Sequence, residues 1–250
     1  LVDYLSHFCG RVACYINDDP FSGRQRQWRL LLKSIPFYDL ITVVREPNIH
    51  EAYNYGAKEV LRVHMSADEV AHAPREINEE EQSEWKNEVV FVGSGWEDRT
   101  LFAAKLIELG VPLTVYGNHW EGQEGWEIVK NHHRRPALGE EYVKAIQCAK
   151  LCLGLLSDRN RDQHTQRSVE IPYIGSVLCA KRTSEHKKMY EEGKEAVFWD
   201  DAEECAEVCF DLLRNEEKRK QIAQNGREKC IENGHLNEKI MSKTIRYLTS

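Results

Sequence analysis

The sequence lacks any long apolar run. No segment reaches about 18 consecutive apolar residues, so we expect no membrane-spanning helix. Residues 1–11 (LVDYLSHFCGR) do not combine a charged region with a long apolar core, and we expect no signal peptide there. An excess of positive charge is also missing, because the formal net charge is -7 and the pI about 5.9. This balance disfavours a protein that coats nucleic acid or an anionic membrane, although it is compatible with a local basic pocket.

Paired cysteine motifs are missing as well. The chain has eight cysteines but no CxxC pair, which argues against a zinc ribbon or a thioredoxin-type site. Cys205 and Cys209 are one helical turn apart, without a matching His or Cys pair nearby in the sequence, and the adjacent His132 and His133 are expected to point apart on a loop. We therefore predict no metal site, and reduced core thiols in a cytoplasmic protein.

Short apolar strands alternate with amphipathic helices, and 250 residues suit one large or two modest domains. In the first part we predict strands at 11–16, 39–44 and 58–63, and helices at 23–35 and 48–56. Residues 66–87 are acidic and polar, and we interpret them as an interdomain linker.

The alternation resumes after residue 87. We predict strands at 88–93, 112–117, 151–156, 176–180 and 196–199, and helices at 97–110, 139–150, 201–214, 215–233 and 236–249. In the helix 97–110, Leu101, Phe102, Leu106 and Leu109 are expected to face inward. The predicted fold class is α/β with two Rossmann-like domains, because strands alternating with helices favour a parallel sheet covered on both faces.

Ligands of such sheets bind at the carboxyl ends of the strands, so the residues that follow the strands are candidate site residues. The strand 88–93 runs into VGSGWEDR, where Gly93, Ser94 and Gly95 permit a tight turn and Arg99 adds a cation. A glycine turn of this kind is common after a strand, and the full GxGxxG spacing of dinucleotide-binding proteins is absent.

The loop that follows the strand 151–156 is rich in hydrogen-bond donors. It holds three arginines, of which Arg167 is the last, together with His164, Thr165 and Ser168, and it leads into a predicted helix. Cations and free backbone N–H groups at a helix start suit a pyrophosphate group. The alternative, a solvated basic loop on an acidic protein, has equal weight from the sequence.

Glu170 follows that loop at the edge of an apolar run. Glu is rarely buried unless it is paired. A carboxylate here can accept two hydrogen bonds from a vicinal diol such as that of a ribose. The alternative is a Glu stabilised by the macrodipole in the first turn of a helix, worth about 0.3–1 kcal/mol.

Several segments, VVFVGSGWEDR, LTVYG, QRSVEIPYIGSVLCAKR and the following MYEEGKEAVFW, resemble the CgeB-like (spore-maturation-protein-like) glycosyltransferases, which have the GT-B fold. The resemblance covers about residues 88–235. It implies a domain that binds a nucleoside-diphosphate sugar, with Glu170 on the ribose and Arg167 and Arg99 near the diphosphate. It extends the candidate site to Tyr116 and Gly117 of LTVYG, and to Asp162, eight positions before Glu170.

The motif NDDPF (17–21) also resembles the N-terminal half of that family. Asp18 or Asp19 lies at the end of a predicted strand and is a candidate to orient or deprotonate an acceptor hydroxyl. The alternative, an Asp-Pro turn, is at least equally compatible with the sequence. The N-terminal half of such proteins forms the domain on the acceptor side. Because only about 65 residues precede the linker here, we expect this domain to lack its first strands.

The predicted organisation is therefore a partial N-terminal domain (1–65), a linker (66–87), a donor-binding domain (88–235) and a final helix (236–250) that packs back on the first domain. The predicted function is metal-independent, cofactor-free transfer of a sugar from a nucleotide sugar to a hydroxyl of a glycan, a protein or another acceptor. Nucleic acid is disfavoured as a partner by the acidity. The alternatives are a sugar-nucleotide epimerase or hydrolase of the same fold, and a non-catalytic nucleotide-sugar-binding or assembly module.

Overall fold

The computed structural model describes Tyr4 and residues 10–23 and 25–249. The chain divides into two units, each described by itself. The first consists of 1–66, 157–163 and 235–250, and the second of 67–156 and 164–234. The segment 1–11, for which no signal peptide is expected, lies largely outside the described residues. Among the described residues, no helix has both the length and the apolar character needed to cross a membrane.

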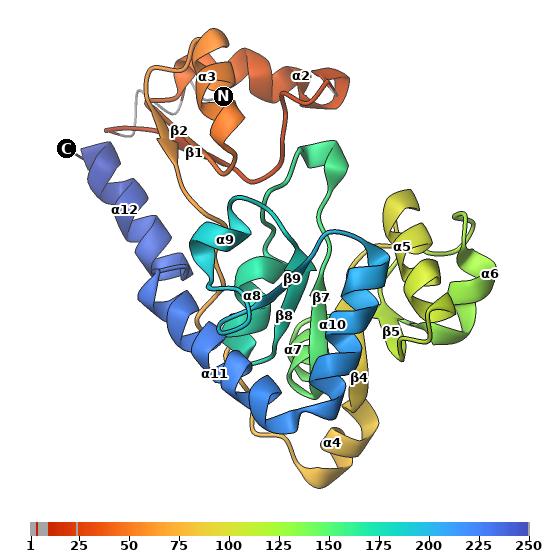
Figure 1. Cartoon of the computed structure of the whole chain (residues 1–250). Helices are drawn as coiled ribbons and strands as arrows, with labels where there is room; N and C mark the ends of the chain where they lie inside the picture. Colours follow the sequence, from red (N-terminus) through yellow and green to blue (C-terminus); the bar gives the residue numbers. More distant parts are fainter. Residues whose placement is uncertain (1–3, 5–9, 24, 250) are drawn as a thin grey trace. The chain divides into compact units, whose positions relative to one another are not determined.

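The first unit contains a parallel sheet of three described strands in the order β1-β2-β3 (Figure 1). Its elements are β1 (Ala13–Ile16), α2 (Gln25–Ser34), η1 (Ile35–Phe37), β2 (Leu40–Val43), α3 (Glu46–Asn54), β3 (Val60–Arg62), η3 (Asp158–Asn160) and α12 (Asn237–Thr249). All four residues of β2 are buried, as expected for a strand covered on both faces. Ile41 and Val43 face the cluster formed with α2 and α3, whereas Leu40 packs with Ile240 of α12.

The second unit contains a parallel six-stranded sheet in the order β6-β5-β4-β7-β8-β9 (Figure 1). Its strands are β4 (Asn87–Val92), β5 (Leu113–Tyr116), β6 (His133–Arg134), β7 (Ala149–Gly154), β8 (Leu178–Lys181) and β9 (Val197–Trp199). Its helices are α4 (Glu79–Trp85), α5 (Glu97–Glu108), α6 (Trp126–Val129), η2 (Lys130–His132), α7 (Glu140–Gln147), α8 (Arg167–Ile174), α9 (His186–Met189), α10 (Ala202–Arg214) and α11 (Glu216–Glu232). The α/β fold class predicted from the sequence is confirmed.

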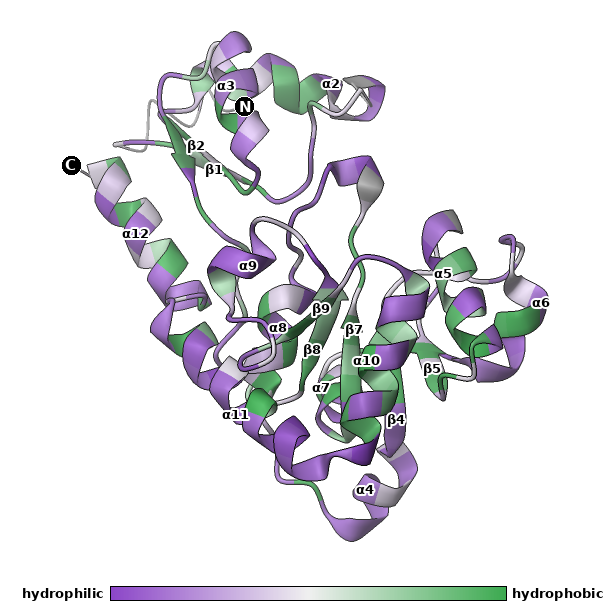
Figure 2. Cartoon of the chain, viewed as in Figure 1, coloured by the Kyte–Doolittle hydropathy of each residue, from purple (hydrophilic) through white to green (hydrophobic). Residues whose placement is uncertain are grey.

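Side chains of β4 alternate between two helical layers. Val89 and Phe91 face a core shared with α5, α6 and α10, while α7 and α8 cover the other face of the sheet. Figure 2 shows hydrophobic residues concentrated in the strands, whereas α11 is mostly hydrophilic. The burial of alternate residues on two different helical layers explains why the strands are apolar along their whole length.

The inward face predicted for the helix at 97–110 is wrong at one position. Leu101 is 40% exposed, whereas Leu106 is fully buried and Phe102 and Leu109 pack at the edge of the core. The stripe that contacts the sheet is formed instead by small residues, Ala103 and Ala104, next to Leu106. Leu101 lies two positions before Ala103, about 200° around the helix, and therefore on the opposite face.

The domain boundaries differ from the segments drawn on the sequence. From Ala67 on, the predicted linker belongs to the second unit, and it contains α4, which begins with a capping box between Asn78 and Glu81. The helix α4 is acidic, with Trp85 as its single buried residue, so it gave no amphipathic signal. The loop 157–163 belongs to the first unit, although it lies in sequence between two elements of the second.

Candidate active site

The chain order of the second sheet reverses between β4 and β7. From β4 the chain proceeds outward to β5 and β6, and it then returns to the other side of β4 to form β7, β8 and β9. The point of reversal is where sheets of this kind bind ligands, beyond the carboxyl ends of the strands. A pocket of about 360 Å³ lies there, within the size range of small-molecule sites. Its lining comprises Ala71, His72, Val92, Gly93, Ser94, Tyr116, Gly117, Asn118, Pro136, Ala137, Leu138, Gly139, Tyr142, Arg167 and Glu170.

Two glycines allow the turns after β4 and β5 to touch. The Gly93 N–H donates to the Tyr116 carbonyl at 2.8 Å. Gly117 has φ +141°, and a Cβ atom at this residue would lie 2.1 Å from the Gly93 oxygen. The Trp120 indole donates to that same oxygen at 3.1 Å. The contact between the two turns therefore requires glycine at position 117.

Glu170 lies in the first turn of α8 and is 4% exposed. The Tyr142 hydroxyl donates a short hydrogen bond to its Oε2 atom. Burial raises the pKa of the Tyr142 phenol well above its usual value, so the phenol keeps its proton and acts as a donor. The Arg167 Nη1 atom lies 3.6 Å from the same carboxylate oxygen. A negative charge is therefore held in the pocket beside a cation.

Arg167 is fixed by the sheet itself. Its Nε atom donates to the Val92 carbonyl at the end of β4, at 3.1 Å, and its guanidinium lies 5.3 Å from the centre of the Tyr142 ring. The remaining nitrogens of the guanidinium carry N–H donors in a rigid plane, which suits phosphate oxygens. Arg167 can therefore present positive charge to an anionic ligand while its own position is constrained.

The second oxygen of Glu170, Oε1, is differently placed. It forms no hydrogen bond with any residue that the structure describes, and the Nε2 atom of His72 lies 3.6 Å away. That separation is longer than a hydrogen bond. A buried carboxylate oxygen in a pocket wall normally finds a donor. Oε1 is thus available to a ligand hydroxyl.

Six of the twelve predicted donor-site residues line this pocket: Gly93, Ser94, Tyr116, Gly117, Arg167 and Glu170. Gly95 packs instead against Trp120, whose ring would lie 2.1 Å from an added Cβ. Arg99 donates to the carbonyls of Ser94 and Leu156, at 3.1–3.2 Å. These two residues do not line the pocket. They stabilise the turns around it.

His164, Thr165 and Ser168 lie at the start of α8, outside the pocket lining. His164 is 2% exposed and forms a short contact with Glu185. The Thr165 N–H, which we expected to face a ligand, donates to the Ser168 hydroxyl at 3.0 Å. Ser168 in turn lies 2.7 Å from the Nε2 atom of the buried His186. These residues form a hydrogen-bonded support beneath the helix that carries Glu170.

Asp162 is placed in the first unit, not in the pocket. It is 8% exposed and accepts a charge-assisted hydrogen bond from Arg45 at 2.8 Å. Its neighbour Arg161 donates hydrogen bonds to the carboxylates of Asp19 and Glu51 in the same unit. The loop 157–163, taken from the sequence as part of a pyrophosphate site, therefore does not line the pocket.

Asp18 and Asp19 also lie in the first unit. Asp19 is 1% exposed and accepts hydrogen bonds from the Phe21 N–H, the Asn48 amide and the Arg161 guanidinium. Asp18 accepts one from the Asn160 amide at 3.3 Å. The geometry of Asp19 is that of a structural ion pair. A catalytic role for Asp18 or Asp19 stays a prediction.

Replacing Arg161 with alanine should destabilise the first unit by about 2 kcal/mol, because it leaves the buried Asp19 carboxylate without its cation. The value is below that of a fully buried pair, since the Arg161 side chain is 39% exposed. Hydrogen exchange of peptides from β1 and β2 measures the loss. Arg26→Ala, an exposed position of α2, is the control. Equal protection in both variants would contradict the structural role.

Sequence reasoning missed much of the pocket lining. Tyr142 falls within the helix predicted at 139–150, and His72 falls within the segment interpreted as a linker. Ala71, Asn118 and residues 136–139 gave no signal. Nothing local marks these residues, because their proximity to Glu170 arises from the packing of segments distant in the chain.

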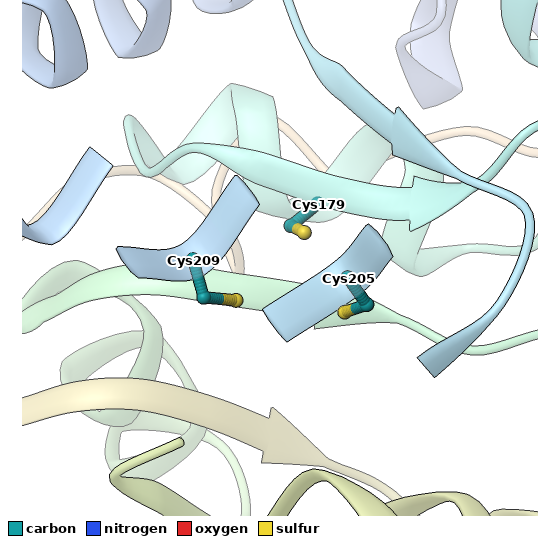
Figure 3. A group of neighbouring side chains, drawn as sticks. All are labelled: Cys179, Cys205 and Cys209. Carbon is teal, nitrogen blue, oxygen red and sulfur yellow. The ribbon is translucent and has the colours of Figure 1, made fainter. Parts of the chain in front are cut away.

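The thiols of the second unit form a cluster that the sequence did not predict. Cys179 of β8 joins Cys205 and Cys209 of α10, and the three sulfurs lie within 4.8 Å of one another (Figure 3). All three residues are fully buried in an apolar core, and no further His, Cys, Asp or Glu among the described residues completes the group.

A metal ion fits this donor set poorly. Burial of all three thiols in an apolar core opposes formation of the thiolates that a metal ion needs. Zinc with three thiolates would leave a net negative charge in apolar surroundings and would lack its usual fourth ligand. We interpret the cluster as packed core thiols.

Comparison with protein families assigns the chain to one of them. A family model described as glycosyl transferase-like matches residues 82–246, more than half of the chain, and the chain belongs to this family. None of the curated proteins compared with the chain matches it.

Solved structures show the same fold. Anabaena HepE in complex with UDP and glucose has a TM-score of 0.72 at 12% identity, covering 99% of this chain and 74% of that chain. S. aureus TarM has a TM-score of 0.65 at 12% identity, and the match covers 95% of this chain but only 50% of TarM. Sucrose-phosphate synthase from Thermosynechococcus elongatus has a TM-score of 0.65 at 13% identity, covering 95% and 67%. The fold is therefore that of GT-B glycosyltransferases.

Proposed function

We propose that the chain is a CgeB-like glycosyltransferase that transfers a sugar from a nucleoside-diphosphate sugar to an acceptor hydroxyl, without a metal ion. The observation that carries the proposal is the pocket at the reversal point of the second sheet, in which the open Oε1 of Glu170 and the guanidinium of Arg167 lie together. Carboxylate and guanidinium complement the two polar parts of a nucleotide, the ribose and the diphosphate.

Each side chain has a definite task in this proposal. Glu170 accepts hydrogen bonds from the ribose, and Tyr142 fixes the direction of its carboxylate. Arg167 stabilises the negative charge that develops on the diphosphate as the bond to the sugar breaks. Stabilisation of developing charge by a fixed cation is often the largest single contribution to catalysis. Because Arg167 is held by Val92, it needs little reorganisation during the reaction.

The proposed nucleotide is uridine diphosphate. Structures of HepE with UDP and with UDP-glucose, and of TarM with UDP, support this choice through their shared fold.

UDP at 100 times its Kd should stabilise the protein by about 2.7 kcal/mol, and the stabilisation should persist in EDTA. Glu170→Gln should weaken UDP binding by about tenfold to a hundredfold, the range of hydrogen bonds to a charged group. Thermal shift and calorimetry measure both effects. Glu124→Gln, an exposed position of the same unit, is the matched control. Failure of the unaltered protein to bind UDP, UDP-glucose or any other nucleoside diphosphate would contradict the proposal.

A further inference from the structure

His72 lies against Glu170 although it comes from a segment that precedes the part of the chain matched by the family model. Its Nε2 atom is 3.6 Å from Glu170 Oε1, and its ring meets the Tyr142 ring edge-on, with 5.8 Å between centres. The side chain of His72 is 19% exposed and lines the pocket. It therefore borders the ligand space on the same side as the open carboxylate oxygen.

A turn fixes the orientation of the His72 ring. The Asp68 carboxylate accepts the N–H groups of Val70 and Ala71 at 2.9 and 2.7 Å. The Asp68 N–H donates to His72 Nδ1 at 3.0 Å. Because Nδ1 accepts this hydrogen bond, the ring proton of neutral His72 lies on Nε2. The pocket thus contains an N–H donor and a carboxylate acceptor side by side.

The pair is too far apart to form a hydrogen bond with itself. Two neighbouring hydroxyl groups of a ligand would satisfy both members, since one hydroxyl can donate to Glu170 Oε1 while the other accepts from His72 Nε2–H. Ribose carries such a vicinal diol, and a 2′- or 3′-deoxyribose does not. A site that hydrogen-bonds a hydroxyl discriminates strongly against an analogue that lacks it, because its own polar groups are then left unpaired.

We propose that His72 is a specificity-determining residue that, together with Glu170, selects ribonucleotides through the ribose diol. The inference rests on the proposed nucleotide-binding function and adds to it a residue outside the matched family region. A merely structural His72 would support the Tyr142 ring and would influence all ligands equally. The two roles therefore differ in how they depend on the ligand.

The test is a comparison of UDP with its 2′-deoxy and 3′-deoxy analogues by calorimetry. The unaltered protein should bind UDP about tenfold or more tightly than either analogue, on the scale of a hydrogen bond to a charged group. His72→Phe keeps a ring beside Tyr142 but removes the Nε2 donor. It should bind UDP about tenfold more weakly and should no longer discriminate against one of the two analogues, while it still discriminates against the other through Glu170.

His72→Ala is measured in the same way. One folded variant is sufficient, because the affinities for UDP and for its two deoxy analogues are compared within the same variant. His50→Gln, an exposed histidine of the first unit, is the control. Unchanged UDP affinity, or equal weakening of UDP and both analogues, would overturn the role of His72 and leave UDP binding itself intact. If the unaltered protein binds no nucleotide, the proposed function fails first, and this inference falls with it.

Discussion

Gly117→Ala should be among the most damaging substitutions in the second unit. The backbone of Gly117 has φ +141°, a conformation that residues with a Cβ atom rarely adopt. An added Cβ would lie 2.1 Å from the Gly93 oxygen and 2.7 Å from its carbonyl carbon. Both opposing atoms belong to the backbone, so the clash cannot be relieved by a rotamer change. We expect a loss of about 4 kcal/mol in the free energy of unfolding, at the upper end for single substitutions.

The substitution should also weaken UDP binding, because the turns after β4 and β5 must separate to accommodate the methyl group. Urea unfolding followed by tryptophan fluorescence measures the stability, since five of the six tryptophans lie in the second unit. Gly122→Ala is the matched control. Gly122 has φ +78° but nothing within 4 Å of an added Cβ, so it isolates the backbone strain, worth about 1 kcal/mol. Equal losses in the two variants would show that the contact between the turns is unimportant.

The arrangement of strands and helices could be predicted from the sequence because its causes are local. Buried parallel strands need continuous apolar segments, as in VVFV at 89–92 and LCLGLL at 151–156. The rule that ligands bind at the carboxyl ends of strands then indicated Gly93 and Glu170, and the family resemblance added Gly117; the structure places all three in one pocket. The short strand β6, two residues long, has no such segment and was missed.

The placement of the loop 157–163 could not be predicted in the same way. Its charges satisfy partners more than 100 positions away in the chain: Asp162 pairs with Arg45, and Arg161 with Asp19. Before the fold is known, an arginine-rich loop has the same composition whether it binds phosphate or carboxylates of its own chain. Arg161 binds carboxylates of its own chain because these are preorganised in the first unit, where Asp19 is buried.

The support beneath α8 leads to the last prediction. His186 is fully buried, stacks on Phe198, and donates from Nδ1 to the Lys181 carbonyl at 2.7 Å. Burial lowers the pKa of His186 from 6.5 to about 4; the nearby His164 acts in the same direction, whereas the hydrogen bond to Lys181 and the charge of Glu185 oppose it. Between these two pH values the unfolded chain binds a proton that the folded protein does not. Stability should therefore fall as the pH is lowered through this range, and it should be fully retained above it.

The contribution of His186 should reach about 2 kcal/mol of lost stability at pH 5, at 1.36 kcal/mol per pH unit. Urea unfolding at pH 7.5 and pH 5 measures it, with the unaltered protein, His186→Gln and the exposed-site control His50→Gln compared at both values. Glutamine cannot titrate, so His186→Gln should lose about 2 kcal/mol less than the other two proteins on acidification, whatever its stability at pH 7.5. Carboxylates contribute to the pH dependence of all three alike, and the difference isolates His186. If the three proteins lose the same amount, the pKa of His186 is the same in the folded and the unfolded chain, and the buried ring carries its proton at pH 5. The hydroxyl of Ser168 would then accept from its Nε2 atom, and the hydrogen-bonded support of the Glu170 helix would be reversed in direction.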